Sequence, residues 1–208
     1  MVFFLFQVFV ISLSGIMAPG PVTAAAVAMG RRAKYAGAFI ATGHAIIEVP
    51  LIIAIMLGMG TVLQSQITQI LIGLVGGVVL LVMAAKMLAG SNNDDTLRNE
   101  HSKTAPIAAG LILSAGNPYF LLWWATVGLA LAARAAQFGI WVFMVFAVIH
   151  LLCDYGWLTT LSWAGFKGAS LLAGRGRKIV LFVCSAALIV FGLSFIAKAT
   201  ISLFSRPA

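Results

Sequence analysis

Apolar residues occur along this chain in blocks of 20 or more, separated by short polar patches. A block of about 20 apolar residues is long enough to cross the hydrocarbon core of a bilayer as an α-helix. The pattern predicts an all-α integral membrane protein. Its six transmembrane helices are expected at residues 3–29, 36–58, 66–89, 106–132, 138–163 and 178–201.

Composition supports this class, because 62% of the 208 residues are apolar and 9% are charged, whereas a soluble domain is about 25% charged. The first block has no basic start and stays apolar through Met29, so we expect a retained helix and not a cleaved signal. Cys153 and Cys184 lie in different blocks without a CxxC motif, and both are interpreted as small core residues.

The longest hydrophilic stretch, SNNDDTLRNEHSKTA from Ser91, lies between the third and fourth blocks. Its density of Asn, Asp, Ser and Thr is typical of a solvated connector, so its acids are expected to have no catalytic role. The chain is thereby divided into a first three-helix repeat at 1–90, a cytoplasmic connector at 91–105 and a second three-helix repeat at 106–208.

Basic residues are distributed unequally between the two sides that alternate loops define. The positive-inside rule places the richer side in the cytoplasm and both termini outside, in a multi-pass protein of the plasma membrane. Lys86 and Lys198 lie near helix ends, where long side chains can reach the headgroups. The richer side carries Arg31, Arg32, Lys34, Lys86, Arg98, Lys103, Lys167, Arg175, Arg177 and Lys178, and the other carries Arg134, Lys198 and Arg206.

Two predicted helices contain proline where a plain membrane anchor would need none. The first contains APGP at 18–21, and the fourth contains AGNP at 115–118. Each proline removes a backbone donor and frees a carbonyl in the middle of a span. A single proline often makes only a kink, but two prolines around a glycine favour a local break. We therefore predict that helices 1 and 4 are broken.

Four ionisable residues lie in the middle of helices 2 and 5. His44 and Glu48 form one i, i+4 pair, and His150 and Asp154 form another, so each pair shares a helix face. Such residues are costly within a bilayer and usually mark a pathway or a polar cavity. Alternatively, each pair satisfies itself and only aids packing. A purely structural scaffold would have no need of acids at this depth.

A broken helix followed by a His-x-x-x-acid helix occurs in residues 1–90 and again in 106–201. Because each half has three helices, the second copy must be inverted in the membrane relative to the first. Two inverted repeats with broken helices are typical of secondary transporters that bind substrate at the midplane. No GxxxxGK[ST] phosphate-binding loop occurs, so transport would be driven by a gradient.

Small residues and tryptophans are interpreted as packing elements. Gly73 and Gly77, spaced by four residues, suit close helix contacts within one chain or in a homodimer. Trp141 and Trp163 fall near span ends, where aromatic belts form. The remaining tryptophans, Trp123, Trp124 and Trp157, are assigned to packing.

Three stretches resemble the LysE/RhtB superfamily of exporters: APGPVTAAAVAMGRRAKYAGAFIATGHAIIE, LILSAGNPYFLLWWATVGLA and VIHLLCDYGWLTTLS. They occur in family order and cover helices 1, 2, 4 and 5. The resemblance implies export of amino acids or similar small solutes and, in the wider superfamily, of metal ions. The positions that correspond to family motifs are Pro19, Gly20, Pro21, Asn117, Pro118 and Asp154; Glu48 stands where many members have Asp.

The leading hypothesis is a proton- or ion-coupled exporter of amino acids or related small zwitterions. Glu48 and Asp154 would alternate between binding a cation and holding a proton, which the imidazoles could relay. Backbone groups freed at the breaks would bind the charged ends of the substrate. The substrate-binding residues expected are Pro19, Gly20, Pro21, Glu48, Asn117, Pro118 and Asp154, and the proton-coupling residues are His44, Glu48, His150 and Asp154.

The same four ionisable residues could instead ligate a divalent metal as cargo, which would make the protein a metal exporter. An enzyme is not expected, because no nucleophile–base signature or HExxH motif occurs. A thiol relay would need paired cysteines of low pKa, which the chain does not offer. We expect no cofactor, no resident metal and no nucleic acid; the expected partners are a small-molecule substrate, membrane lipid and a second copy in a homodimer.

Overall fold

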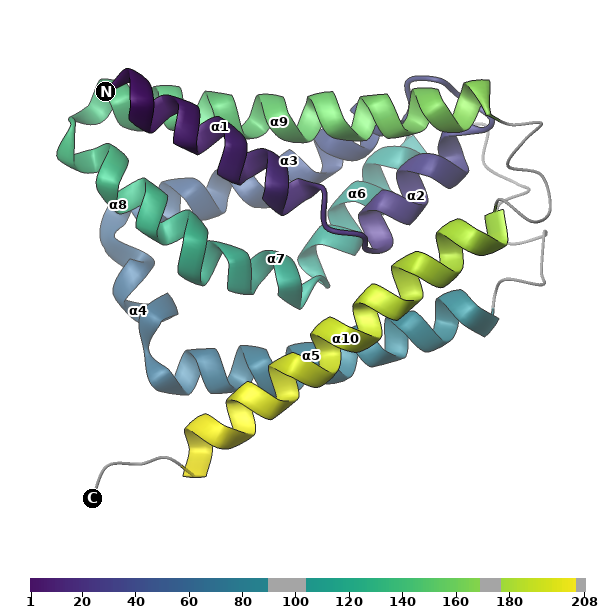
Figure 1. The fold of residues 1–208 in the computed structure, drawn as a ribbon. Helices are drawn as coiled ribbons and strands as arrows, with labels where there is room; N and C mark the ends of the chain where they lie inside the picture. The colour runs from purple at the N-terminus through teal and green to yellow at the C-terminus, as the bar shows by residue number, and fades with distance from the viewer. Residues whose placement is uncertain (90–103, 169–176, 205–208) are drawn as a thin grey trace.

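The computed structural model describes residues 1–89, 104–168 and 177–204, and every regular element in these ranges is helical (Figure 1). By length and composition, five helical segments can cross a membrane, and the bent pair of the first two helices makes a sixth. The all-helical membrane class is confirmed. The elements are α1 (Val2–Ile16), α2 (Pro21–Gly30), α3 (Ala36–Ala54), π-helical η1 (Ile55–Met59), α4 (Gly60–Gln64), α5 (Gln66–Ala89), α6 (Thr104–Ala115), α7 (Pro118–Trp123), π-helical η4 (Trp124–Gly128), α8 (Leu129–Gln137), α9 (Ile140–Lys167) and α10 (Arg177–Phe204).

Most predicted spans agree with the observed helices. The helix expected at 66–89 is α5 with the same bounds, and those expected at 138–163 and 178–201 are α9 and α10 within four residues. The helix expected at 36–58 is α3 with η1. Most of the expected connector at 91–105 lies outside the described residues, although its last two positions already belong to α6.

The first predicted helix is broken where its prolines stand. α1 ends at Ile16, α2 begins at Pro21, and their axes differ by 78°. Pro21 is the first residue of α2, a position at which no backbone donor is required. Gly20 before it has extended backbone with φ −163° and ψ −172°. The four residues between the two helices, Met17 to Gly20, therefore interrupt the helical hydrogen-bond ladder.

The fourth predicted helix also consists of two pieces. α6 ends at Ala115, and Asn117 caps the next helix by accepting a hydrogen bond from the Tyr119 amide at 3.1 Å. Pro118 again occupies the first helical position. α7 then continues through η4 into α8, so the second piece runs to Gln137 and not to residue 132.

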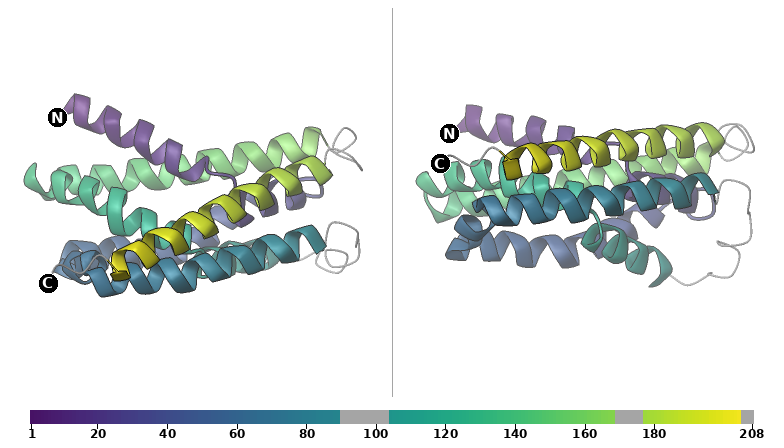
Figure 2. Two further views of the ribbon diagram at one scale, coloured as in Figure 1. Left: turned by 60° about the horizontal axis from the view of Figure 1, so that its bottom comes forward. Right: turned by 90° about the horizontal axis from the view of Figure 1, so that it is seen from below.

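Glycines bring several helices into backbone contact. A Cβ added at Gly43 of α3 would overlap the carbonyl oxygen of Ile107, and one added at Gly110 of α6 would overlap that of Ile40. The stripe at Gly73 and Gly77 packs against α10 (Figure 2). The small-residue spacing therefore serves packing within one chain, as expected for helices in lipid.

Most of the described basic residues lie at one end of the bundle, whereas Arg134 and Lys198 do not. The α2–α3 connection, the C-terminal ends of α5 and α9 and the start of α10 all lie at the right of Figure 1. They carry Arg31, Arg32, Lys34, Lys86, Lys167 and Lys178. The N-terminus and the end of α8, with Arg134, lie at the opposite end. Arg98, Lys103, Arg175 and Arg206 lie outside the described residues.

Replacing Gly110 by Ala should destabilise the bundle, because the new Cβ would push α3 and α6 apart. Forced overpacking of this kind costs roughly 1–3 kcal/mol. Thermal unfolding in detergent measures the effect. The matched control is Gly156→Ala on α9, where an added Cβ has no atom within 4 Å. Equal melting temperatures for the two variants would contradict the proposed backbone contact.

Candidate functional site

A small pocket lies where the two helix breaks meet the centres of α3 and α9. It is lined by Pro19, Gly20 and Pro21 from the first break, Asn117 from the second, and His44, Glu48, His150 and Asp154 from the two intact helices. Its free space of about 60 Å³ is enough for a few water molecules. Four segments far apart in the chain thus converge on one point.

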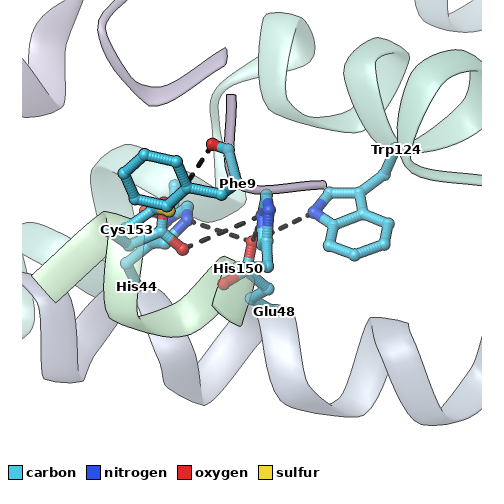
Figure 3. A network of polar contacts seen from close by, with 8 residues as sticks. Phe9, His44, Glu48, Trp124, His150 and Cys153 are labelled. Carbon is cyan, nitrogen blue, oxygen red and sulfur yellow. Dashed lines mark hydrogen bonds and ion pairs between the residues drawn. The ribbon is translucent and has the colours of Figure 1, made fainter. Parts of the chain in front are cut away.

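Glu48 is the centre of the polar network in this pocket. Its side chain is 0% exposed, and its Oε1 accepts a hydrogen bond from Nε1 of Trp124 at 3.1 Å. Nε2 of His150 lies 3.0 Å from the same oxygen, and Nε2 of His44 lies 3.4 Å from it (Figure 3). Nitrogen groups from three helical segments therefore surround one buried carboxyl oxygen, which compensates for its removal from water.

Residues of α6 and α7, the two pieces of the fourth predicted helix, contact both imidazoles. Nδ1 of His44 lies 2.6 Å from the hydroxyl oxygen of Ser114, and its ring packs edge-on against Phe120. The His150 ring stacks on Trp123 with a centroid separation of 4.9 Å. The second break thus positions the two groups that face Glu48.

Asp154 brings a second buried carboxyl group into the pocket. One ligand atom each from His44, Glu48 and Asp154 lies within 4.8 Å of the others. Nε2 of His150 is 3.8 Å from Oδ2 of Asp154. Two carboxylates this close repel each other strongly in a medium of low dielectric constant, and a proton or a bound cation relieves the repulsion.

Some hydrogen-bonding capacity in the pocket is unused. Oε2 of Glu48, Oδ2 of Asp154 and Nδ1 of His150 are buried and have no hydrogen-bond partner within the described part of the chain. Buried polar atoms are rarely left without partners. These atoms are therefore available to a polar ligand in the pocket.

A family model described as LysE type translocator matches residues 13–199, which is most of the chain. The chain belongs to the LysE type translocator family. This confirms the resemblance drawn from the sequence motifs, and the family consists of transporters of small solutes. No match is found among curated proteins or among solved structures.

Most of the residues predicted for the site of this translocator lie together. His44, Glu48, His150 and Asp154 share the pocket, but Oε1 of Glu48 lies closer to His150 on another helix than to His44 on its own. Pairing confined to each helix is therefore not what the structure shows. Pro118 does not line the pocket; it begins α7 and packs against Gly76 of α5.

Sequence reasoning missed the role of two tryptophans. Trp124, which is 1% exposed, donates to Glu48, and Trp123 stacks on His150. A buried indole usually needs a partner for its N–H, so two tryptophans just after an Asn-Pro break in an apolar span were the available signal. Trp141 and Trp163 are 81% and 47% exposed, which suits the interpretation as interfacial anchors.

Removing the Ser114 hydroxyl should destabilise the translocator, because Nδ1 of His44 would lose its buried partner. Leaving such a group unpaired costs about 1–3 kcal/mol. The matched control is Ser185→Ala, since Ser185 is equally buried but its hydroxyl has no partner within the described residues. Thermal unfolding of Ser114→Ala and Ser185→Ala checks this, and a shift as large in the control would refute the role of Ser114.

Proposed function

We propose that the protein is a secondary active exporter of amino acids or related small zwitterions, driven by a proton or ion gradient. One observation carries the proposal. Glu48 and Asp154, from opposite halves of the chain, are enclosed with two imidazoles in a buried pocket between two helix breaks. Ionisable groups at this depth are costly, and in transporters they serve substrate and ion pathways.

The two carboxyl groups suit the ammonium end of a zwitterion. An ammonium group would relieve their mutual repulsion and would satisfy the unused oxygens of Glu48 and Asp154. A proton can relieve the same repulsion, so substrate and proton compete for one site. Binding of one would then release the other, and this competition couples export to a gradient. His44 and His150, which face the carboxyl groups, would relay the proton.

The first helix break suits the carboxylate end. α2 begins at Pro21, so the amides of Val22 and Thr23 precede the first intrahelical hydrogen bond, which Ala24 donates to Gly20. Both residues line the pocket. The amide end of a helix attracts negative charge. A zwitterion would therefore lie between the acids of α3 and α9 and the start of α2.

The two halves are proposed to be inverted repeats. Exchanging the halves replaces the α1–α2 pair by α6–α7, α3 by α9 and α5 by α10. The packing follows this exchange: α1 packs on α9 as α6 packs on α3, and α10 contacts α2 as α5 contacts α7. Both second pieces also begin with proline after a residue in extended conformation. This arrangement supports a substrate site on the axis between the halves.

The basic end of the bundle is proposed to face the cytoplasm, with both termini outside the plasma membrane. The positive-inside rule supports this orientation. Arg31, Arg32 and Lys34 between α2 and α3 have no counterpart in the short α8–α9 connection at the opposite end, which consists of Phe138 and Gly139. Export would then carry solute from the basic end to the opposite end.

Export should depend on both carboxyl groups. Proteoliposomes loaded with a labelled amino-acid mixture, or with Zn²⁺ or Mn²⁺, and placed under a pH gradient should release amino acids for the wild type and not for Glu48→Gln or Asp154→Asn. Lys86→Gln, an exposed change on α5 outside the pocket, is the control and should transport normally. Release of metal alone would refute the proposal in favour of metal export, and unchanged flux in the carboxyl variants would remove their proposed roles.

Gly20→Ala should slow transport without unfolding the protein. A Cβ at Gly20 has only the carbonyl oxygen of Ala18 within 4 Å, at 4.0 Å, so the methyl group occupies open space at the pocket wall. One extra carbon in a pocket of about 60 Å³ should cost roughly tenfold or more in transport efficiency. Gly156→Ala should transport at the wild-type rate, and a wild-type rate for Gly20→Ala would place substrate elsewhere.

A further inference from the structure

A second cavity adjoins the central pocket on the side away from the basic end. It has a volume of about 380 Å³, compared with about 60 Å³ for the central pocket. Its lining residues belong to α5, α7, η4 and α10. Tyr119 and Trp123 line both spaces, so these two side chains form the partition between them. We call this larger cavity, lined by residues of α5, α7, η4 and α10, the vestibule.

The vestibule contains one charged residue within the described chain, Lys198 of α10. The polar residues Gln69, Thr126 and Ser202 also line the vestibule. Lys198 precedes the end of α10 by six residues, which is about 9 Å along a helix. The described acids, Glu48 and Asp154, both line the other pocket, so Lys198 has no ion pair among the described residues. A cation placed in this way is available to an oxyanion.

The two spaces therefore offer ionisable groups of opposite sign on the two sides of the partition formed by Tyr119 and Trp123. The central pocket offers carboxyl groups, and the vestibule offers an ammonium group. A simple amine would be attracted only by the first, whereas a molecule with both an ammonium and a carboxylate group is complementary to both. The same opposition would draw the carboxylate of a departing zwitterion past Tyr119 and Trp123.

We propose that the vestibule is a second binding site on the exit path, in which Lys198 binds the carboxylate of the zwitterion and Tyr119 and Trp123 gate its passage from the central pocket. The proposal rests on the proposed export of zwitterions and adds the residue that selects for the carboxylate. Lipid phosphate offers the same oxyanion chemistry. Because Tyr119 and Trp123 line both the vestibule and the central pocket, we favour the substrate carboxylate over a lipid phosphate as the ligand of Lys198. A site for a lipid headgroup would not need to share these residues with the substrate pocket.

The test is an exchange assay in proteoliposomes of the full-length protein. Its probes are L-threonine, L-leucine and L-lysine, each with its carboxamide, which keeps the ammonium group and lacks the carboxylate. Lys198→Gln and the uncharged isostere Lys198→Met should raise the half-saturating concentration of an exchanged amino acid roughly tenfold, the usual effect of losing one charged hydrogen bond. The value for the carboxamide should not change, and Lys198→Arg should stay near the wild type.

Lys86→Gln is the control, since it removes a lysine near the end of α5 that does not line the vestibule. If the wild type exchanges amino acids and Lys198→Gln and Lys198→Met have the same half-saturating concentration as Lys86→Gln, the vestibule site is wrong but the proposed export function stands. Equal loss for amino acid and carboxamide would overturn the carboxylate assignment. An effect seen with anionic phosphatidylglycerol and not with neutral phosphatidylcholine would assign Lys198 to lipid. Absence of wild-type exchange for all three amino acids would refute the proposed function together with this site.

Discussion

A carboxyl group enclosed in an apolar bundle needs polar partners, and the arrangement around Glu48 meets that requirement with groups from distant segments. The indole of Trp124 and the imidazoles of His44 and His150 all approach one oxygen of Glu48. Each of these groups is placed by a further contact, His44 by Ser114 and His150 by Trp123. The positions of α3, η4 and α9 are therefore tied together through a single side chain, and the pocket forms where they meet.

The two helix breaks place backbone hydrogen-bonding groups in the pocket that an intact helix would use within itself. Proline at the start of α2 and of α7 ends one hydrogen-bond ladder and begins another, so backbone groups reach the centre of the bundle. Close glycine contacts, such as those of Gly43 and Gly110, hold the helices around the breaks at backbone distance. Close packing of the helices around the two breaks therefore brings the polar groups of the pocket together.

Sequence patterns were sufficient for most of the spans and pointed to the four ionisable residues that line the pocket, but they did not give Trp123 and Trp124 or the way these residues interact. The length of the apolar blocks determines the helices. The depth of His44, Glu48, His150 and Asp154 indicated a pathway or a polar cavity, but not that all four side chains meet in one pocket. The contact between Trp124 and Glu48 joins residues 76 positions apart, and Trp124 begins the π-helical segment η4 beyond the second break. A contact over this separation has no signature in residue spacing, because it depends on how the helices pack. The same limit explains why Pro118 was expected in the pocket although it lies against Gly76.

The network around Glu48 also bears on how the protein is made. Synthesis runs from the N-terminus, so Glu48 enters the bilayer 76 residues before Trp124 and 102 residues before His150. During that interval α3 carries a carboxyl group whose only described partner is His44. Glu48 therefore has all its partners only after the second half of the chain has been inserted. Completion of the polar network around Glu48 is then a late step of biogenesis, and the two halves of the chain depend on each other for it.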